Sequence, residues 1–450
     1  MPRATINVTD PLAASRTWEP VQFTVDDHID GALWLAETSD GQQVVCQRLT
    51  APSAKTQTTF ITTMHLAGRT ELSLLRPISR DQAPYGIRQL EPQETDAFAR
   101  LDTGYFDLEM CSGTGQGTGS SKWGLRHFAR VAEGVDLLPS GNNAIGGFYG
   151  PFFTPENGLI NPPEHTKVAI NVIEEGPVLH HYQMRGTIPD GLLPELHGKH
   201  FTIDWQFTYG TSHFRRTYQV DPFQTVINGR SITNKITVGD EFESGQGSVV
   251  FDRFEQHADT RYRDGDPYAG ELAAMVHKTL ASPGSTSERF QQFKNALDND
   301  ITSAHWDLYW RLFSTWEAAL SDQEIRHRLG AVCATSHVLA DLPNRPWIIS
   351  AQPVNVSSAD EETIFAGPAS KTAEFNSVTG QTMIWYTSKP SGAFQIVQRP
   401  QSGWVNWGTN SENECPELPV GVEIKTSYGQ FDNWQTSADA LETEPVATTA

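Results

Sequence analysis

The sequence predicts a mainly β protein, built as one large antiparallel β-sandwich with a helical insertion. Three observations lead to this fold class. Short alternating or apolar runs, separated by Gly, Asp and Pro turn signals, recur from Trp18 to Phe254. The period then changes to three-to-four residues between Pro267 and Leu342, which is typical of helices. Strand patterns return after Pro346.

The length of 450 residues allows two or three domains, or one large β domain with an insertion. The helical block carries an aromatic stripe that includes Trp306 and Trp310, and its few helices cannot bury this stripe among themselves. We therefore expect the block to pack on the sandwich. The predicted segments are an N-terminal β module (1–90), the central sandwich (91–266), the helical insertion (267–342), C-terminal strands completing the sandwich (343–437) and a disordered tail (438–450).

Charge narrows the classes of partner. The formal net charge is −21, so nucleic acid and an anionic membrane surface would both be repelled. A locally basic cleft can still take an anionic sugar. No run of about 18 apolar residues is present, and the N-terminal stretch lacks the apolar core of a signal peptide. We therefore expect a cytoplasmic protein whose partner is a saccharide rather than nucleic acid or a membrane.

The opening strands are expected between Trp18 and Arg76. Candidate strands there read VQFTV, ALWLAE, QQVVCQRL, TTFITTMHL and ELSLLR, with DDHIDG, TSDG and AGRT as turns. The centre of the prediction is the stretch 174–220. A strand turns successive side chains to opposite sides. Phe201 and Trp205 therefore lie on one face, and Thr202 lies on the opposite face with the other even-numbered residues of the strand.

Histidine, arginine and tyrosine side chains on these central strands are suited to acid–base chemistry on a sugar. An ordinary structural strand usually carries Val, Ile and Thr instead. The predicted catalytic residues are His213, Tyr218, His181 and Arg216. The predicted substrate-binding residues add further cations, an acid and aromatic side chains in Gly- and Pro-rich loops: Arg185, Arg215, Asn143, Tyr149, Trp404, Trp407 and Glu417.

Strand geometry constrains these residues further. His180 and His181 are neighbours, so at most one of them points into a given site. Arg215 and Arg216 likewise face opposite ways, and one of them should contact the ligand. His213 and Tyr218 are five residues apart, so a shared site requires a bulge or a contribution from the edge of the sheet. We expect a partly exposed His213 that acts as a base and titrates near 6.5.

Other site classes find less support. The Gly-rich stretch 111–128 lacks the GK[ST] ending of a P-loop, and no GxSxG elbow or Cys signature is present. We expect no cofactor. A bound metal ion stays open as an alternative, because histidines are scattered through the β region, although without HExxH or CxxC spacing: His127, His165, His180, His181 and His213.

Two stretches carry a family resemblance. The first is a strand, a DG turn, a strand ending at Gln47 and then TFITTMHLAGRTELSLL, which resembles the opening β module of sandwich domains in large α-mannosidases. The second is the EEGPV strand leading into the Tyr-Gly and RRTY strand pair. Together they resemble the galactose-mutarotase-like super-β-sandwich of carbohydrate-active enzymes. The resemblance implies sugars lying across a concave sheet face, and it matches no catalytic glutamate. The positions it implies are His180 or His181, Arg185, His213, Arg215 or Arg216, and Tyr218.

These observations favour a carbohydrate-active enzyme that cleaves a uronate-containing glycan by β-elimination. That reaction needs Arg or Asn to neutralise the carboxylate and His or Tyr to move two protons. A glycoside hydrolase of the same fold is an alternative and needs two carboxylates about 5–9 Å apart. A sugar epimerase needs one base and one acid, such as His213 and Glu417. The rival from another class is a non-catalytic carbohydrate-binding protein.

Overall fold

The structure is a computed structural model, and antiparallel sheets dominate it, which confirms the predicted fold class. Among the described residues, no helix is both long and apolar enough to cross a membrane. The structure describes residues 3–12, 15–50, 56–116, 122–138, 145–148, 166–188, 194–227, 230–243, 253–257, 283–285, 288, 347–350, 362–366, 369–376, 379–391, 394–399, 404–411 and 415–449.

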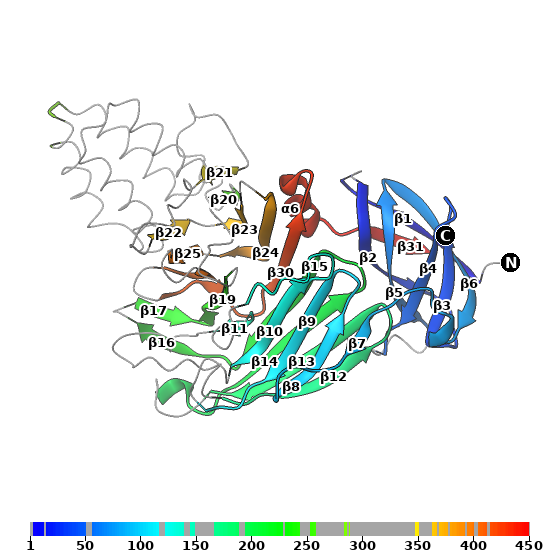
Figure 1. Cartoon of the computed structure of the whole chain (residues 1–450), viewed down its shortest axis with the longest axis horizontal. Helices are drawn as coiled ribbons and strands as arrows, with labels where there is room; N and C mark the ends of the chain where they lie inside the picture. Colours follow the sequence, from blue (N-terminus) through cyan, green and yellow to red (C-terminus); the bar gives the residue numbers. More distant parts are fainter. Residues whose placement is uncertain are drawn as a thin grey trace.

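The N-terminal module is a seven-stranded sheet with its own apolar core (Figure 1). Alternation builds this core, because every second residue, such as Ile6, Val8, Leu72 and Leu74, points into it. The strands in spatial order are β2 (Ser15–Val25), β5 (Thr58–Ala67), β4 (Gln43–Arg48), β3 (Leu33–Thr38), β6 (Arg69–Ile78), β1 (Ala4–Thr9) and β31 (Val446–Thr449).

The C-terminal tail is ordered, and the prediction of disorder over 438–450 is wrong. Asn433 caps the helix α6 (Trp434–Glu442), since its side chain accepts a hydrogen bond of 3.0 Å from the backbone N–H of Thr436. Strand β31 then pairs with β1. A short polar tail gains order here because it completes a sheet whose partner strand comes from the other end of the chain.

The large sandwich is built on a nine-stranded sheet. Its register is regular through the central strands, with Trp205 opposite both Tyr182 and Arg216. The strands in spatial order are β12 (Ala169–Glu175), β13 (Leu179–Thr187), β14 (His200–Thr208), β15 (His213–Val220), β30 (Glu423–Gln430), β24 (Gln381–Ser391), β23 (Ala369–Phe375), β20 (Arg253–His257) and β21 (Trp347–Ser350).

A second layer covers the inner face of this sheet (Figure 1). Trp123, Phe106 and Phe128 from this layer pack against Phe201, Phe214 and other side chains of the nine-stranded sheet, and together they form the main core. One sheet of the layer has the order β10 (Trp123–Arg130), β9 (Phe106–Ser112), β8 (Ala97–Asp102) and β7 (Arg88–Leu90). The other has the order β11 (Gly147–Phe148), β19 (Val238–Glu243), β26 (Trp404–Gly408), β25 (Phe394–Arg399) and β22 (Glu362–Ala366).

Short elements complete the described chain. Three two-stranded pairs and two 3-10 turns connect the larger sheets. These are β16 (Gln224–Ile227) with β17 (Arg230–Thr233), β18 (Lys235–Ile236) with β29 (Leu418–Pro419), β27 (Asn410–Ser411) with β28 (Cys415–Pro416), η1 (Arg80–Gln82) and η4 (Pro194–Leu196).

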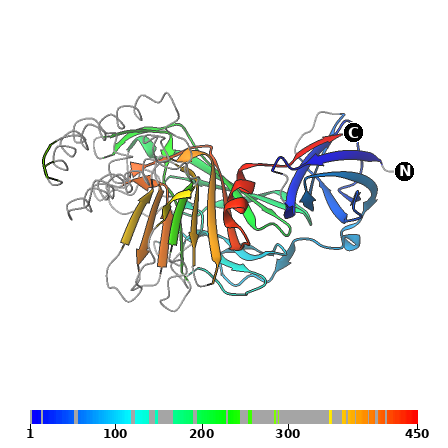
Figure 2. The ribbon, with the colours of Figure 1, turned by 90° about the horizontal axis from the view of Figure 1, so that it is seen from above.

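The N-terminal module lies beside the sandwich, and α6 lies between them (Figure 2). Leu33, Val45 and Ile61 of the module pack against Val178 and Leu179 at the start of β13. On the outer face of the nine-stranded sheet, the side chains of α6 pack against β23 and β24. Lys425 of β30 donates to the carbonyl of Leu441, and Arg215 of β15 pairs with Glu444, so the end of α6 covers the outer face near these strands as well.

Most of the predicted helical insertion falls outside the described residues; 283–285 and 288 are the exceptions. Its packing on the sandwich stays a prediction.

Candidate functional site

Strand β15 divides the predicted catalytic residues between two faces of the nine-stranded sheet. His213 and Arg215 lie on the outer face, in register with Ser427 and Lys425 of β30. Arg216 lies on the inner face, opposite Trp205, and Tyr218 is buried in the same core. The register of β15 is regular on both sides, so the bulge that a shared site for His213 and Tyr218 requires is not present in this strand. The expectation that these two side chains meet is therefore wrong.

The inner-face residues are buried in the core, where Arg216 and Tyr218 each reach a partner, although Nε of Arg216 has none among the described residues. Arg216 is 0% exposed and makes a bidentate ion pair with Asp240, with both N–O distances at 2.7 Å. Trp385 donates to the same carboxylate at 3.0 Å, and the hydroxyl of Tyr218 donates to the carbonyl of Gly146 at 3.0 Å. Burial raises the pKa of Tyr218, so its hydroxyl keeps its proton. These contacts tie the two layers of the sandwich together.

Other predicted residues lie on the outer face, two strands away from His213. His181 hydrogen-bonds Asp204 at 2.9 Å, and the side-chain amide of Gln183 donates to the same carboxylate at 3.1 Å. Arg185 donates to Gln183 at 2.6 Å and is exposed. His180 faces the opposite way and hydrogen-bonds Tyr182 at 2.6 Å, as the period of a strand requires.

The remaining predicted binding residues are scattered. Arg215 pairs with Glu444 at 2.5 Å, and the buried Glu417 pairs with Lys235 at 3.0 Å. The structure therefore gives both Arg215 and Arg216 a carboxylate partner. Asn143 and Tyr149 lie outside the described residues, as do the side chains of Trp404 and Trp407 on β26.

A cavity lies where the N-terminal module, the sandwich and α6 meet; we call it the interface cavity. Its volume is about 290 Å³, and His213 is the one predicted catalytic residue that borders it. Hydroxyl, charged and aromatic side chains alternate around it. The residues that line it are Ser15, Arg16, Thr17, Glu19, Tyr105, Arg130, Ser212, His213, Gln430, Phe431, Thr436, Ser437, Ala440 and Leu441.

A β-bulge in β2 places Arg16 and Glu19 at this cavity. The register with β5 shifts between these two residues, and Trp18 has a φ of 53°, a backbone conformation that large side chains rarely adopt. The Trp18 ring packs against His65, Tyr85 and Tyr209, and these contacts hold the bulge in place. Strain held at a bulge is typical of functional positions, where it re-aims side chains.

Arg16 fixes the position of Glu19. Its guanidinium makes a bidentate pair with Asp10 at 2.9 and 2.7 Å and a further contact of 3.1 Å to Glu19. It also donates to the carbonyls of Ala440 and Thr443 at the end of α6. One buried cation thus joins β2, the end of β1 and α6, so the wall of the cavity is held rigidly.

His213 is a buried histidine that borders the cavity. Its side chain is buried, with the residue 5% exposed, and Nε2 has no hydrogen-bond partner among the described residues. Burial lowers the pKa of His213 well below 6.5, and the cations of Arg215, Lys425 and Arg16 lower it further. The expectation of a partly exposed histidine that titrates near 6.5 is therefore corrected.

Glu19 shifts in the opposite direction. Burial raises the pKa of this carboxyl above its usual 4.5, although Arg16, Arg215 and Lys425 oppose the shift. The same three cations act on His213, so the two groups share one electrostatic environment. Burial thus favours the uncharged form of both groups, and a carboxyl and an imidazole that border one cavity can serve as a proton donor and a proton acceptor.

Arg130 and Tyr105 form another part of the wall. The Arg130 guanidinium lies over the Tyr105 ring at 5.1 Å and pairs with Glu133 at 2.5 Å. Its Nε has no hydrogen-bond partner among the described residues. Arg130 is thus a half-buried cation that lines the cavity and has one unpaired donor.

Within the described residues, no group of three or more His, Cys, Asp or Glu side chains is arranged to hold a metal ion. His127 and His180, two of the scattered histidines, are instead bonded to Asp136 and Tyr182.

Sequence reasoning missed Glu19, Arg16, Tyr105, Arg130 and Phe431. They come from four separate parts of the chain, and no local pattern joins them. One signal was present: Arg16 and Glu19 interrupt the apolar alternation of SRTWEPVQFTV, a strand whose core residues Val21 and Phe23 are otherwise regular. Charged residues inside such a strand indicate a bulge or a site.

No protein-family model and no curated protein sequence matches this chain. Solved structures do match at low similarity. An alpha-mannosidase from Enterococcus faecalis has 8% identity to this chain and a TM-score of 0.45. The match covers 100% of this chain and 46% of the mannosidase chain. A glycosyl hydrolase family 38 protein from the same organism has 8% identity and a TM-score of 0.47. This match covers 99% of this chain and 47% of the hydrolase chain. This chain thus spans about half the length of these two structures.

A galactose mutarotase-like protein from Clostridium acetobutylicum also matches, with 8% identity and a TM-score of 0.35 over 77% of this chain and 98% of its own. The matching structures thus include galactose mutarotase-like proteins, the group that the sequence resembles. At these scores the similarity assigns no reaction to this chain.

Proposed function

We propose that the chain is a carbohydrate-active enzyme that moves protons on a single sugar ring held in the interface cavity. The observation that carries this proposal is the pair His213 and Glu19, which line one cavity and have pKa values shifted in opposite directions. Each shift favours the uncharged form of its group, so the carboxyl is suited to donate a proton and the imidazole to accept one.

The lining supports a sugar as the ligand. Hydroxyl and amide groups, including those of Ser212, Thr436 and Gln430, offer hydrogen bonds to several ring hydroxyls. Tyr105 and Phe431 offer apolar faces for the C–H side of a ring. A cavity of about 290 Å³ is near the lower end of ligand pockets, roughly 300–1,000 Å³, and it suits one ring rather than a polymer.

The reaction best matched to this pair is the interconversion of sugar anomers. Nε2 of neutral His213 takes the proton of the anomeric hydroxyl, while protonated Glu19 gives its proton to the ring oxygen. The bond between the anomeric carbon and the ring oxygen breaks, and a carbonyl forms. After rotation of the aldehyde both steps reverse: the Glu19 carboxylate takes back the proton from the former ring oxygen, protonated His213 returns its proton to the carbonyl oxygen, and the ring closes as the other anomer. Arg16 stabilises the Glu19 carboxylate that exists between these steps.

β-Elimination on a uronate is the second candidate, and one observation favours it. The spare Nε of Arg130 provides a donor for the substrate carboxylate, which this reaction must neutralise. His213 then removes the adjacent proton and Glu19 protonates the leaving oxygen. Glycoside hydrolysis has less support, because the described lining of the cavity contains one carboxylate, Glu19, rather than two.

The experiment is to follow the optical rotation of freshly dissolved α-D-glucose, α-D-galactose and α-D-glucuronate with and without the protein. We expect faster approach to equilibrium for at least one sugar. Glu19→Gln and His213→Asn should each lower that rate by about 10²–10⁴-fold, with circular dichroism unchanged. Glu417→Gln is the matched control, because Glu417 is a buried, paired glutamate outside the cavity. If no sugar reacts faster, and if uronate-containing oligosaccharides give no unsaturated product, the proposal is wrong.

A further inference from the structure

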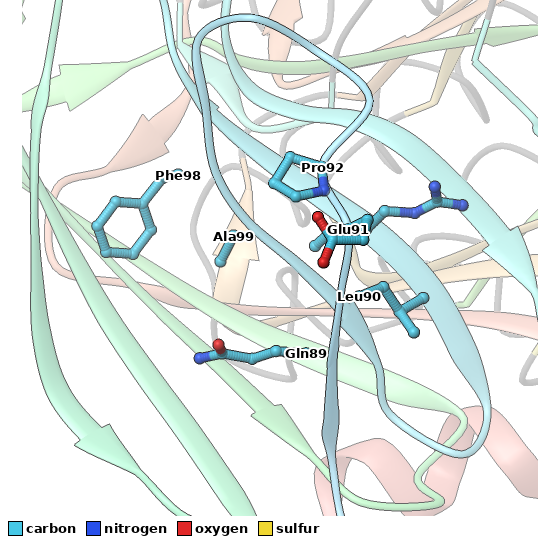
Figure 3. Close-up of a pocket in the computed structure, with 7 residues that line it drawn as sticks. Gln89, Leu90, Glu91, Pro92, Phe98 and Ala99 are labelled. Atoms are coloured by element: carbon cyan, nitrogen blue, oxygen red, sulfur yellow. The ribbon is translucent and has the colours of Figure 1, made fainter.

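We infer that a second saccharide-binding site, separate from the interface cavity, lies where the β7–β8 hairpin opens at the edge of the sandwich. A pocket of about 410 Å³ is present there, and all of its lining comes from this hairpin. Figure 3 shows Phe98 and Gln89 extending in the same direction from the hairpin, while Leu90 extends in the other. The lining residues are Gln89, Leu90, Glu91, Pro92, Phe98, Ala99 and Arg100.

A β-bulge sets the direction of Phe98. The register of β8 with β9 shifts between Ala97 and Ala99, so Phe98 is the extra residue of a bulge. Its ring meets the edge of Tyr182 on β13 at a centroid distance of 5.3 Å and an angle of 83°. Without the bulge, Phe98 would point away from Ala99, which packs on the core. The bulge therefore brings a ring from the covering layer to the edge of the nine-stranded sheet.

The Phe98 ring is left 38% exposed, which is unusual for a large apolar side chain that contacts the core. A second bulge faces it, because β12 shifts register with β13 between Val172 and Glu174. Val172 lies opposite Tyr182 and is exposed. Two bulges at one edge of the sandwich thus present apolar surface on both sides of a buried tyrosine, beside a polar pocket. Bulges of this kind are common at functional edges of sheets.

The polar groups around Phe98 define the chemical class of the ligand. Gln89 donates to Glu175 of β12, which holds the amide in place and leaves its oxygen as an acceptor. Glu91 adds a carboxylate at the loop end of the pocket. The cation Arg100 is already engaged in a bidentate pair with Asp107 at 3.0 and 2.7 Å. Acceptors without a free cation repel an anionic sugar and suit the hydroxyls of a neutral one.

A neutral pyranose is therefore the expected occupant, with its C–H face on the Phe98 ring and its hydroxyls donating to Gln89 and Glu91. An aromatic platform beside a few fixed polar groups is the usual composition of a small-molecule site. Such a site would hold a saccharide at the surface without reacting with it, because no acid–base pair is present in its described lining.

The test uses methyl β-D-glucopyranoside, whose equatorial substituents leave two apolar ring faces, and saturation-transfer difference NMR. Mannitol is the matched probe, since it has similar hydroxyls without a ring face. We expect binding of the glucoside at about millimolar Kd, with strongest transfer to the protons of one ring face, and no transfer to mannitol.

Phe98→Ala and Phe98→Leu should weaken binding about tenfold or more, and Phe98→Trp should retain or strengthen it. Leu75→Ala is the matched control, because Leu75 is 37% exposed but lies on β6 of the N-terminal module. Glu19→Gln should leave this binding unchanged, which separates the site from the interface cavity. Absence of binding, equal transfer to mannitol, or undiminished binding in Phe98→Ala would each overturn the inference.

Discussion

The two faces of β15 contain the same kinds of side chain in opposite situations. On the inner face, Arg216 and Tyr218 are buried and each reaches a partner from the covering layer. On the outer face, His213 is buried as well, yet its Nε2 has no partner among the described residues and it borders a cavity. Two hydrogen bonds to Asp240 hold Arg216 in the core, although its Nε also lacks a partner among the described residues, whereas the His213 imidazole borders a cavity and is the group that we propose acts on a ligand.

The largest effect expected from this contrast is on stability. Arg216→Met should lower the free energy of unfolding by about 3–5 kcal/mol, because it leaves Asp240 buried without its cation. Arg215→Met, one residue away, should cost less than about 1 kcal/mol, because its partner Glu444 has a half-exposed side chain. Urea unfolding of the two variants measures both values.

The double variant Arg216→Met/Asp240→Leu is the control, since it removes both charges and should recover most of the loss. Equal losses for Arg215→Met and Arg216→Met would mean that the two faces do not differ in the way described.

A smaller effect is expected at Glu374, a buried carboxyl on β23 whose oxygens have no partner among the described residues. Burial raises the pKa of Glu374 well above 4.5. Its folded form therefore binds more protons than its unfolded form above pH 4.5, and stability falls as pH rises toward the folded pKa. Glu374→Met should raise the free energy of unfolding by about 1–3 kcal/mol at pH 7 and less below pH 4.5.

Glu109 is the matched control for Glu374, because it is also buried but accepts hydrogen bonds of 2.8 and 2.7 Å from the backbone of Gln93 and Glu94. Glu109→Met should therefore destabilise the protein. If Glu374→Met destabilises it at every pH, Glu374 has a partner in the folded protein and the expectation fails.

The smallest effect is on the pH dependence of turnover. Activity should fall on the acid side only below pH 6.5, because the pKa of His213 is lowered by burial and by Arg215, Lys425 and Arg16. Arg215→Met removes one of these cations and should move the acid limb upward by less than about one pH unit. A pH–rate profile of both proteins checks this, and an acid limb at or above 6.5 in the wild type would contradict it.

The sequence predicted the faces of the central strands well, because one rule, the two-residue period, decides them. Phe201, Ile203, Trp205 and Phe207 share one face, as expected, and the structure shows that this face is buried; His180 and His181 point apart. The fold class followed from the same periodicity. The period cannot show which face becomes covered by another part of the chain, and this limited the prediction of the site.

The interface cavity could not be read locally for that reason. Its wall depends on a bulge at Trp18, on a turn that carries Tyr105 and on a helix near the C-terminus. The helix was missed because ADALETEP has few apolar residues, and its order comes from packing Ala438 and Leu441 on the sheet. Tertiary contacts outweighed local propensity here.

The most direct test of the account is an NMR titration of the His213 imidazole nitrogens, assigned with His213→Asn. We predict a neutral ring at pH 6.5, with protonation well below it, and a change in the Nε2 shift when a converted sugar is added. Glu19→Gln should alter the sugar-dependent change, while Glu417→Gln should not. A histidine that titrates near 6.5 and does not respond to any sugar would contradict the assignment of the interface cavity as the active site.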